Sequence, residues 1–259
     1  FGLFLPVTSP LFLPSSDVRA SLLYGYLLFA AGFLTYPLGA IIFGYIGDTY
    51  GRKKALTISI IAMALATTCI GILPVYTQIG IMAPIALCLC RIVQGICAGG
   101  EYIGSGLLVV EHMSTKYPGF FGATSAAAGT FGALLAALTG SIFTLSTMPN
   151  WAWRIPFLLG TLLGFVGLYI RQKVEESPEF HRVRFNKESL IKKIPLLKVL
   201  KTHPFSLACA VGIGALGTVP FYFVMGYLNT SLVVNGKISH SAMMVINAFI
   251  SFFCASTLP

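Results

Sequence analysis

Two ionisable residues, Arg91 and Glu101, lie within an otherwise apolar run of the sequence. If this run crosses a bilayer, each charge costs at least ~2.5–3.5 kcal/mol near the centre, so both should face a bundle interior or a water-filled cavity. Ten helical residues separate them, about 15 Å along the axis and about 80° around it. Gln94 and Tyr102 occupy the same general face. We predict that these four residues contact a solute or couple a proton, with a structural Arg–Glu network as the alternative.

A second apolar run places two tyrosines after glycines and a proline that permit a kink or partial unwinding of a helix. Tyr222 and Tyr227 follow Pro220 and can contact a polar solute or close an outer gate. Anchoring of the rings at the membrane interface explains them equally well. Both tyrosines are therefore candidate site residues with this alternative left open.

The short connection at 44–54 combines glycine with opposite charges. Gly44 and Gly51 let the chain reverse tightly and let helices approach each other. Asp48 falls where one helix should end, and Arg52 where the next should begin. Such a cluster can bind neighbouring helix ends in one conformation and release them in another, which favours a gate over a plain basic loop.

Apolar runs of spanning length must position these residues. The chain has 259 residues, of which 56% are hydrophobic and 10% charged, whereas a soluble domain carries roughly 25% charged residues. A membrane-spanning helix needs about 20 apolar residues. We predict full spans near 21–45, 55–75, 81–109, 120–146, 153–171 and 204–230, with partial spans at 1–14 and from 239 onward.

The basic residues alternate between connections. Thirteen of the seventeen Lys and Arg residues fall on one set of alternate connections, which includes 52–54 and 171–201. The opposite set holds only Arg19, Arg154 and Lys237, so the first set should face the cytoplasm. We expect an N-terminal six-helix bundle at 1–171 with an incomplete first helix, a cytoplasmic linker at 172–203, and the truncated start of a second bundle at 204–259.

Other chemistries lack their residues. The six cysteines all lie in apolar segments without zinc-ligand spacing, and the sequence has no phosphate-binding G-x-x-x-x-G-K-[ST] or zinc-binding H-E-x-x-H motif. We therefore expect neither a metal nor a cofactor, and no enzyme activity. The formal charge of +9 follows the membrane topology, so we expect contact with membrane lipid and not with nucleic acid.

Five motifs resemble one known family. The stretch 44–53 resembles the signature loop G-x-x-x-D-x-x-G-R-[RK] of the major facilitator superfamily, and 91–95 resembles its R-x-x-Q-G motif, which is associated with proton coupling. The stretches 99–102, 153–157 and 175–180 resemble the metabolite:proton symporter family within it. That family includes proline/glycine-betaine, 2-oxoglutarate, citrate and shikimate carriers.

The resemblance implies an all-α membrane protein with the major facilitator fold of six plus six helices, truncated here to seven or eight. It implies that Asp48, Arg52 and the acidic residue Glu111 form a cytoplasmic gate. The expected function is proton-coupled symport of a small polar zwitterion, such as proline or betaine, by a monomer in the bacterial inner membrane. The alternatives are a di- or tricarboxylate symporter for 2-oxoglutarate or citrate, a transport-deficient solute sensor, or a gene remnant. We expect the chain to be a fragment of a longer polypeptide.

Overall fold

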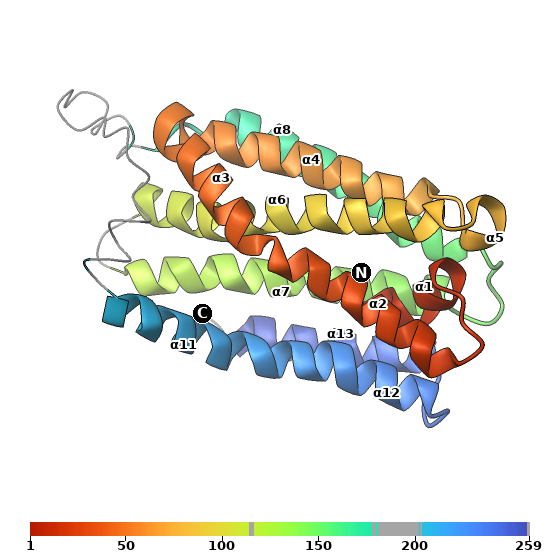
Figure 1. The fold of residues 1–259 in the computed structure, drawn as a ribbon. Helices are drawn as coiled ribbons and strands as arrows, with labels where there is room; N and C mark the ends of the chain where they lie inside the picture. Colours follow the sequence, from red (N-terminus) through yellow and green to blue (C-terminus); the bar gives the residue numbers. More distant parts are fainter. Residues whose placement is uncertain (114–116, 178–179, 181–201, 203, 258–259) are drawn as a thin grey trace.

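The computed structural model describes residues 1–259 apart from 114–116, 178–179, 181–201, 203 and 258–259. Regular structure in the described residues is helical, and the long helices lie side by side in an elongated bundle (Figure 1). The elements in chain order are η1 (Gly2–Phe4), α1 (Leu5–Phe12), α2 (Val18–Leu34), α3 (Tyr36–Tyr50), α4 (Arg52–Ile72), α5 (Tyr76–Ile79), α6 (Met82–His112), α7 (Pro118–Phe143), η2 (Ala152–Arg154), α8 (Ile155–Lys173), α11 (Pro204–Tyr222), the π-helical segment η4 (Phe223–Leu228), α12 (Asn229–Val234) and α13 (His240–Thr257).

The lengths of the apolar helices confirm the predicted spans. Within the described residues, six helical stretches are long and apolar enough to cross a membrane: Arg19–Tyr50, Arg52–Ile72, Met82–His112, Gly119–Phe143, Ala152–Lys173 and Pro204–Val234. The shorter apolar helices Gly2–Phe12 and His240–Ser256 match the predicted partial spans. Helices suit this environment because they satisfy their backbone polar groups within the segment. The all-α membrane fold class is therefore confirmed.

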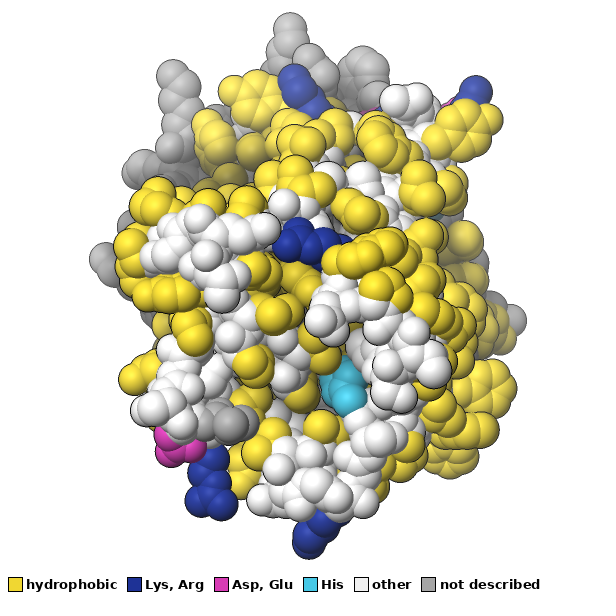
Figure 2. Space-filling view, turned by 90° about the vertical axis from the view of Figure 1, so that its right-hand side faces the viewer, with side chains coloured by type: hydrophobic (Ala, Val, Ile, Leu, Met, Phe, Trp, Pro, Cys, Tyr) yellow, Lys and Arg dark blue, Asp and Glu magenta, His cyan; other side chains and the backbone are white. Residues whose placement is uncertain are grey.

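Connections alternate between the two ends of the bundle. The turn between α3 and α4, the C-terminal end of α6, the N-terminal end of α7 and the C-terminal end of α8 lie together at the left of Figure 1. This end carries the basic residues 52–54. Figure 2 views the opposite end, where apolar and uncharged side chains cover most of the face and charged side chains are sparse. Among the described residues of the predicted basic connections, 52–54, Arg171 and Lys173 thus lie at one end.

The second spanning stretch is not one continuous helix. It breaks at Thr35, between α2 and α3, because Pro37 in the first turn of α3 cannot donate a backbone hydrogen bond to the preceding turn. The Thr35 hydroxyl instead donates to the carbonyl oxygen of Gly32 at 2.7 Å and lies 3.2 Å from that of Ile92 on α6. The break is therefore held against α6.

Glycines on α6 allow its backbone to touch its neighbours. A Cβ atom on Gly95 would overlap the carbonyl oxygen of Gly32, and one on Gly99 would overlap that of Tyr36. On the facing helix, a Cβ atom on Gly39 would overlap the carbonyl oxygen of Ile96. Small residues permit this close approach, which replaces the hydrophobic driving force that lipid does not supply. The break at Thr35 and these glycines together fix α2 and α3 against the helix that carries Arg91.

The largest buried cluster lies at the less charged end of the bundle. It joins side chains of η1, α1, α4, α6, η2, α8 and α13 through Phe4, Phe12, Ile70, Ala83, Leu87, Trp153, Phe157 and Met244. Phe12 meets Trp153 edge-on with ring centroids 5.8 Å apart, and Phe4 lies 5.4 Å from Phe157. Such tilted aromatic pairs are favourable beyond the area that they bury. The cluster anchors the start of the chain, which lines the cavity described below.

The helices after residue 203 differ in how closely they pack against the first six spans. Helix α13 packs along α7, where Leu134 and Ala137 meet Ala248 and the Ser241 hydroxyl donates to the carbonyl oxygen of Ser141 at 2.9 Å. Helix α11 buries no residue against the rest of the bundle. The division at 172–203 stays a prediction, since most of the predicted linker lies outside the described residues.

Candidate functional site

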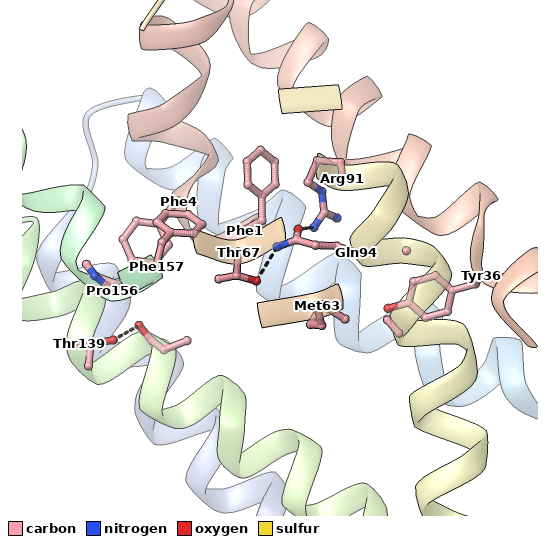
Figure 3. Close-up of a pocket in the computed structure, with 13 residues that line it drawn as sticks. Phe1, Phe4, Tyr36, Met63, Thr67, Arg91, Gln94, Thr139, Pro156 and Phe157 are labelled. Carbon is pink, nitrogen blue, oxygen red and sulfur yellow. Dashed lines mark hydrogen bonds between the residues drawn. The ribbon is translucent and has the colours of Figure 1, made fainter. Parts of the chain in front are cut away.

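A cavity of about 300 Å³ lies between the helices at the level of Arg91 (Figure 3). Phe1 and residues of η1, α3, α4, α6, α7 and α8 line it, so each of the first six spans contributes to its wall. The lining residues are Phe1, Phe4, Tyr36, Met63, Thr67, Arg91, Gln94, Gly95, Ala98, Ala136, Thr139, Pro156 and Phe157. The lining is mainly apolar and aromatic, with polar groups gathered on α4 and α6, which is the usual composition of a small-molecule site.

Arg91 is the charged member of the cavity lining. Its Nη1 donates to Oε1 of Gln94 at 2.7 Å, and its guanidinium lies 4.7 Å from the ring centroid of Phe1 and 5.5 Å from that of Phe29. Its Nε is buried without a hydrogen-bond partner. Gly32 leaves the space for this side chain, because a Cβ atom there would lie 2.8 Å from Nη2 of Arg91. The guanidinium is thus held by an amide and by ring faces.

The charge of Arg91 has no anionic partner in the described part of the chain. Among the residues that the structure describes, no Asp or Glu carboxylate lies within 4.0 Å of this guanidinium. A buried, unpaired charge is costly, and an anion that enters the cavity would remove part of that cost. Arginine is suited to this role because its fork of donors matches the two oxygens of a carboxylate. The cavity is therefore electrostatically complementary to a single negative charge.

Gln94 connects Arg91 to the neighbouring helix α4. Its Nε2 donates to the hydroxyl oxygen of Thr67 on α4 at 2.8 Å, while its Oε1 accepts from Arg91 (Figure 3). Gln94 is 8% exposed, whereas Arg91 and Thr67 are partly buried, so the amide at the centre of these contacts is the most shielded group. Sequence reasoning found Arg91 and Gln94 but missed Thr67. A hydroxyl within an apolar span was its only signal, and α4 carries several of these.

An aromatic cluster lies next to the cavity. Phe33 stacks on Tyr36 at 5.1 Å, and Tyr222 of α11 meets Phe33 edge-on at 4.8 Å. The predicted residue Tyr222 therefore connects α11 to the cavity wall through Phe33 and Tyr36. Tyr227 does not, because it is 57% exposed and stacks on Phe223 at 5.5 Å.

Glu101 lies apart from the cavity, although it shares α6 with Arg91. Its carboxylate forms an ion pair with Arg171 of α8 and accepts a hydrogen bond from the hydroxyl of Ser59 on α4 at 3.3 Å. Arg171 also donates to the carbonyl oxygen of Leu56. The structure thus does not bring Glu101 to Arg91. Sequence reasoning counted Arg171 only among the basic residues of the connection, because nothing in its spacing shows that α8 lies against α4.

The predicted neighbour of Glu101 is also outside the cavity. The side chain of Tyr102 is 65% exposed, and it is absent from the cavity lining. It follows Glu101 directly and so leaves the helix about 100° further around the axis. Its predicted role in solute contact has no support from its position in this structure.

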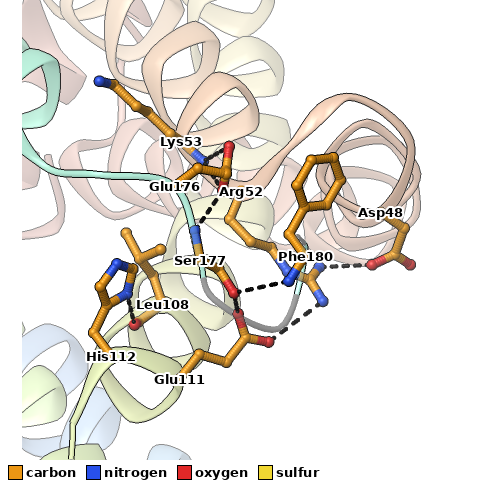
Figure 4. A network of polar contacts seen from close by, with 9 residues as sticks. All are labelled: Asp48, Arg52, Lys53, Leu108, Glu111, His112, Glu176, Ser177 and Phe180. Carbon is orange, nitrogen blue, oxygen red and sulfur yellow. Dashed lines mark hydrogen bonds and ion pairs between the residues drawn. The ribbon is translucent and has the colours of Figure 1, made fainter. Parts of the chain in front are cut away.

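The predicted gate residues meet at the basic end of the bundle (Figure 4). Arg52 lies 2.7 Å from a carboxylate oxygen of Asp48 and 3.7 Å from one of Glu111 at the end of α6. Gly51 separates α3 from α4 with a φ of +112°, a conformation that side chains other than glycine rarely adopt. Gly44 has no atom near its Cβ position and takes no part in these contacts.

Two further residues from the end of α8 complete this network. The carboxylate of Glu176 accepts from the backbone N–H of Lys53 at 3.2 Å, in the first turn of α4, and from that of Ser177 at 3.0 Å. The Ser177 hydroxyl donates to Glu111. A carboxylate at a helix N-terminus satisfies free N–H groups and complements the helix dipole. The signal for both residues was the Glu-Glu-Ser-Pro-Glu-Phe stretch, which sequence analysis used only for the resemblance.

Comparison with protein families gives one match over most of the chain. The family described as "Sugar (and other) transporter" matches residues 12–194. The proline/betaine transporter of Salmonella typhimurium is 33% identical over 95% of this chain and 52% of the relative. The glycine betaine/proline/ectoine/pipecolic acid transporter OusA of Dickeya dadantii is 34% identical over 90% of this chain and 48% of that protein. The chain spans about half the length of these relatives.

Solved structures show the same fold. A double tryptophan mutant of XylE aligns with a TM-score of 0.73 and 17% identity, over 98% of this chain and 62% of that one. The Escherichia coli xylose transporter XylE in a partially occluded inward-open conformation aligns with a TM-score of 0.68 and 16% identity, over 98% of this chain and 66% of the transporter. Another neighbour is titled a D-xylose-proton symporter.

Proposed function

Because the chain belongs to the sugar (and other) transporter family of the major facilitator superfamily, we propose that its protein is a proton-coupled symporter of a small zwitterion of the proline and betaine type. The observation that carries the proposal is the unpaired guanidinium of Arg91 in a cavity lined by aromatic rings. Arg91 binds the carboxylate of the solute, and the ring faces receive its cationic or apolar part.

The composition of the cavity favours one carboxylate over two or three. Arg91 is the single Lys or Arg among the lining residues, so a second carboxylate of 2-oxoglutarate or citrate would be buried without a partner. Ring faces attract cations, and quaternary ammonium groups are bound in proteins by such rings. Phe1, Phe4, Tyr36 and Phe157 supply them here. The di- and tricarboxylate alternative is therefore disfavoured.

The relatives support the same class of solute. Two of them carry names that include proline and betaine, and they match 95% and 90% of this chain. A cavity of about 300 Å³ is of the size that takes a small solute. The solute assignment thus has support from chemistry and from similarity independently.

Proton coupling has its own candidate group. Glu101 is a carboxylate within a span, and such groups mark proton relays in transporters. Its partner Arg171 lies on another helix, so protonation of Glu101 would release α8 from α6. In our proposal the proton acts on this pair, and the solute acts on Arg91. The two events are linked through α6, which carries both Glu101 and Arg91.

The network around Arg52 acts as the cytoplasmic gate in this proposal. It joins the α3–α4 turn, the end of α6 and the segment after α8, which are the parts that must separate when a path opens at that end. The two partly exposed ion pairs of Arg52, each worth little alone, suit a contact that forms and breaks in every cycle. In the same proposal, the predicted division of the chain at 172–203 separates two units that rock against each other.

Transport by the reconstituted protein tests this proposal. We expect uptake of labelled proline or betaine into proteoliposomes with an inward proton gradient, and loss of accumulation when a protonophore is added. Unlabelled betaine should compete, whereas citrate and 2-oxoglutarate should not. Accumulation that persists with the protonophore would contradict proton coupling, and competition by citrate alone would contradict the solute class.

A further inference from the structure

The contacts of Gln94 fix which way its amide group points. The guanidinium of Arg91 can only donate hydrogen bonds, so the amide oxygen of Gln94 must face it. The amide nitrogen then faces Thr67 and needs an acceptor there, which the threonine hydroxyl provides at 2.8 Å. With the reverse orientation two donors would face each other at Arg91. The chemistry of the groups therefore determines the direction of the whole chain of contacts.

Thr67 has a neighbour that makes similar contacts elsewhere. The hydroxyl of Thr68 lies 2.7 Å from that of Thr161 on α8 and also donates to the carbonyl oxygen of Ala64. Thr68 is absent from the cavity lining, whereas Thr67 belongs to it. The two adjacent threonines on α4 thus have different partners. Thr68 contacts α8, whereas Thr67 contacts the amide of Gln94 beside Arg91. This difference separates a positioning role from a structural one.

We propose that Thr67 is a positioning residue for the solute carboxylate, acting through Gln94 on Arg91. This inference rests on the proposed function, in which Arg91 binds that carboxylate. Without an acceptor at position 67, the amide of Gln94 can turn, and Nη1 of Arg91 loses its anchor on α6. The guanidinium then samples more orientations and must be ordered again when a solute binds, which weakens binding. The maximal transport rate does not depend on this anchor.

The test compares the kinetics of betaine uptake by the full protein in proteoliposomes for four single variants and one double variant, which combines Thr67→Val with Gln94→Leu. Thr67→Val removes the acceptor but keeps the shape, and Thr67→Ser keeps the acceptor. Thr68→Val is the matched control, because it removes a hydroxyl of the same helix that lies outside the cavity. Gln94→Leu removes the amide through which Thr67 is proposed to act.

We expect Thr67→Val to raise KM by about five- to tenfold, the effect of one lost anchoring hydrogen bond, with the maximal rate changed by less than about twofold. Thr67→Ser and Thr68→Val should both keep KM within about twofold of the wild type. In the Gln94→Leu background, Thr67→Val should add less than about twofold, because residues that act in series are not additive.

Three results would overturn the inference while leaving the proposed function in place. The first is a wild-type KM in Thr67→Val. The second is a KM raised equally in Thr67→Ser, which would assign the effect to packing. The third is a full additional rise in KM when Thr67→Val is introduced in the Gln94→Leu background. A wild-type protein that takes up neither betaine nor proline would overturn the proposed function itself, and with it the contact on which Thr67 depends.

Discussion

The carboxylate of Glu101 on α6 pairs with the guanidinium of Arg171 on α8, and not with Arg91 of its own helix. The two charges of α6 are therefore used for separate purposes. Arg91 lines the cavity without an anionic partner, and Glu101 ties three helices together through Arg171 and Ser59. In the proposed function, the proton and the solute act at these two separate places, so they must be coupled through the movement of α6.

The Glu101–Arg171 pair should be energetically coupled. Glu101→Gln and Arg171→Gln each leave a partly buried charge unpaired, so each should lower stability by about 1–3 kcal/mol. The double variant should be less destabilised than the sum of the two, with a coupling of at least about 1 kcal/mol. Thermal unfolding of the detergent-solubilised variants, followed by tryptophan fluorescence, measures this cycle. Strictly additive effects would contradict the pairing.

Replacement of Arg91 should affect solute affinity severely. We expect Arg91→Gln to raise KM for betaine more than about tenfold, because the charge that faces the solute carboxylate is lost. Arg91→Lys should rescue it only in part, since an ammonium group cannot contact Gln94 and grip two carboxylate oxygens in one plane. Uptake kinetics check both, and Arg19→Gln is the control, because Arg19 is exposed in the first turn of α2. An Arg91→Lys variant with wild-type KM would speak against a bidentate contact.

Glycine at position 99 should be required for helix packing. A Cβ atom there would overlap the carbonyl oxygen of Tyr36, so Gly99→Ala should force the backbones of α3 and α6 apart and cost about 1–3 kcal/mol. Gly129 on α7 has open space at its Cβ position, so Gly129→Ala should be neutral or stabilise the helix by up to about 1 kcal/mol. Unfolding midpoints in detergent compare the two variants. An equal loss of stability in both would contradict the close contact between Gly99 and the backbone of Tyr36.

The cytoplasmic network should affect turnover more than binding. Arg52→Gln removes the contacts with both Asp48 and Glu111, so the gate should close poorly and the uptake rate should fall at least about tenfold. Betaine affinity, measured by calorimetry, should change less than about twofold because the cavity lies at another level of the bundle. Lys54→Gln is the control, since Lys54 is exposed and contacts only the ring of Tyr50 among the groups described. Unchanged uptake in Arg52→Gln would exclude the gate.

Local sequence patterns were sufficient to predict the helices and their alternation. Hydropathy is a property of consecutive residues, so 20-residue apolar runs predict spans wherever the runs then pack. The basic connections follow the same logic, as does the meeting of Arg52 with Asp48, which lies one helical turn away in sequence. The break at Thr35 was missed, although Pro37 gave a local signal for it.

Only the tertiary structure determined which helices share a contact. Periodicity shows that Gln94 and Glu101 face inward, but it does not show that Thr67 and Arg171, from α4 and α8, are the groups that they meet. Those partners depend on the rotation and crossing of helices that are far apart in sequence, which side-chain packing over the whole bundle sets. The sequence by itself therefore determined that this chain spans a membrane with charges inside it. The fold decided that, within the part of the chain that the structure describes, Glu101 has an opposite charge on a neighbouring helix and Arg91 has none.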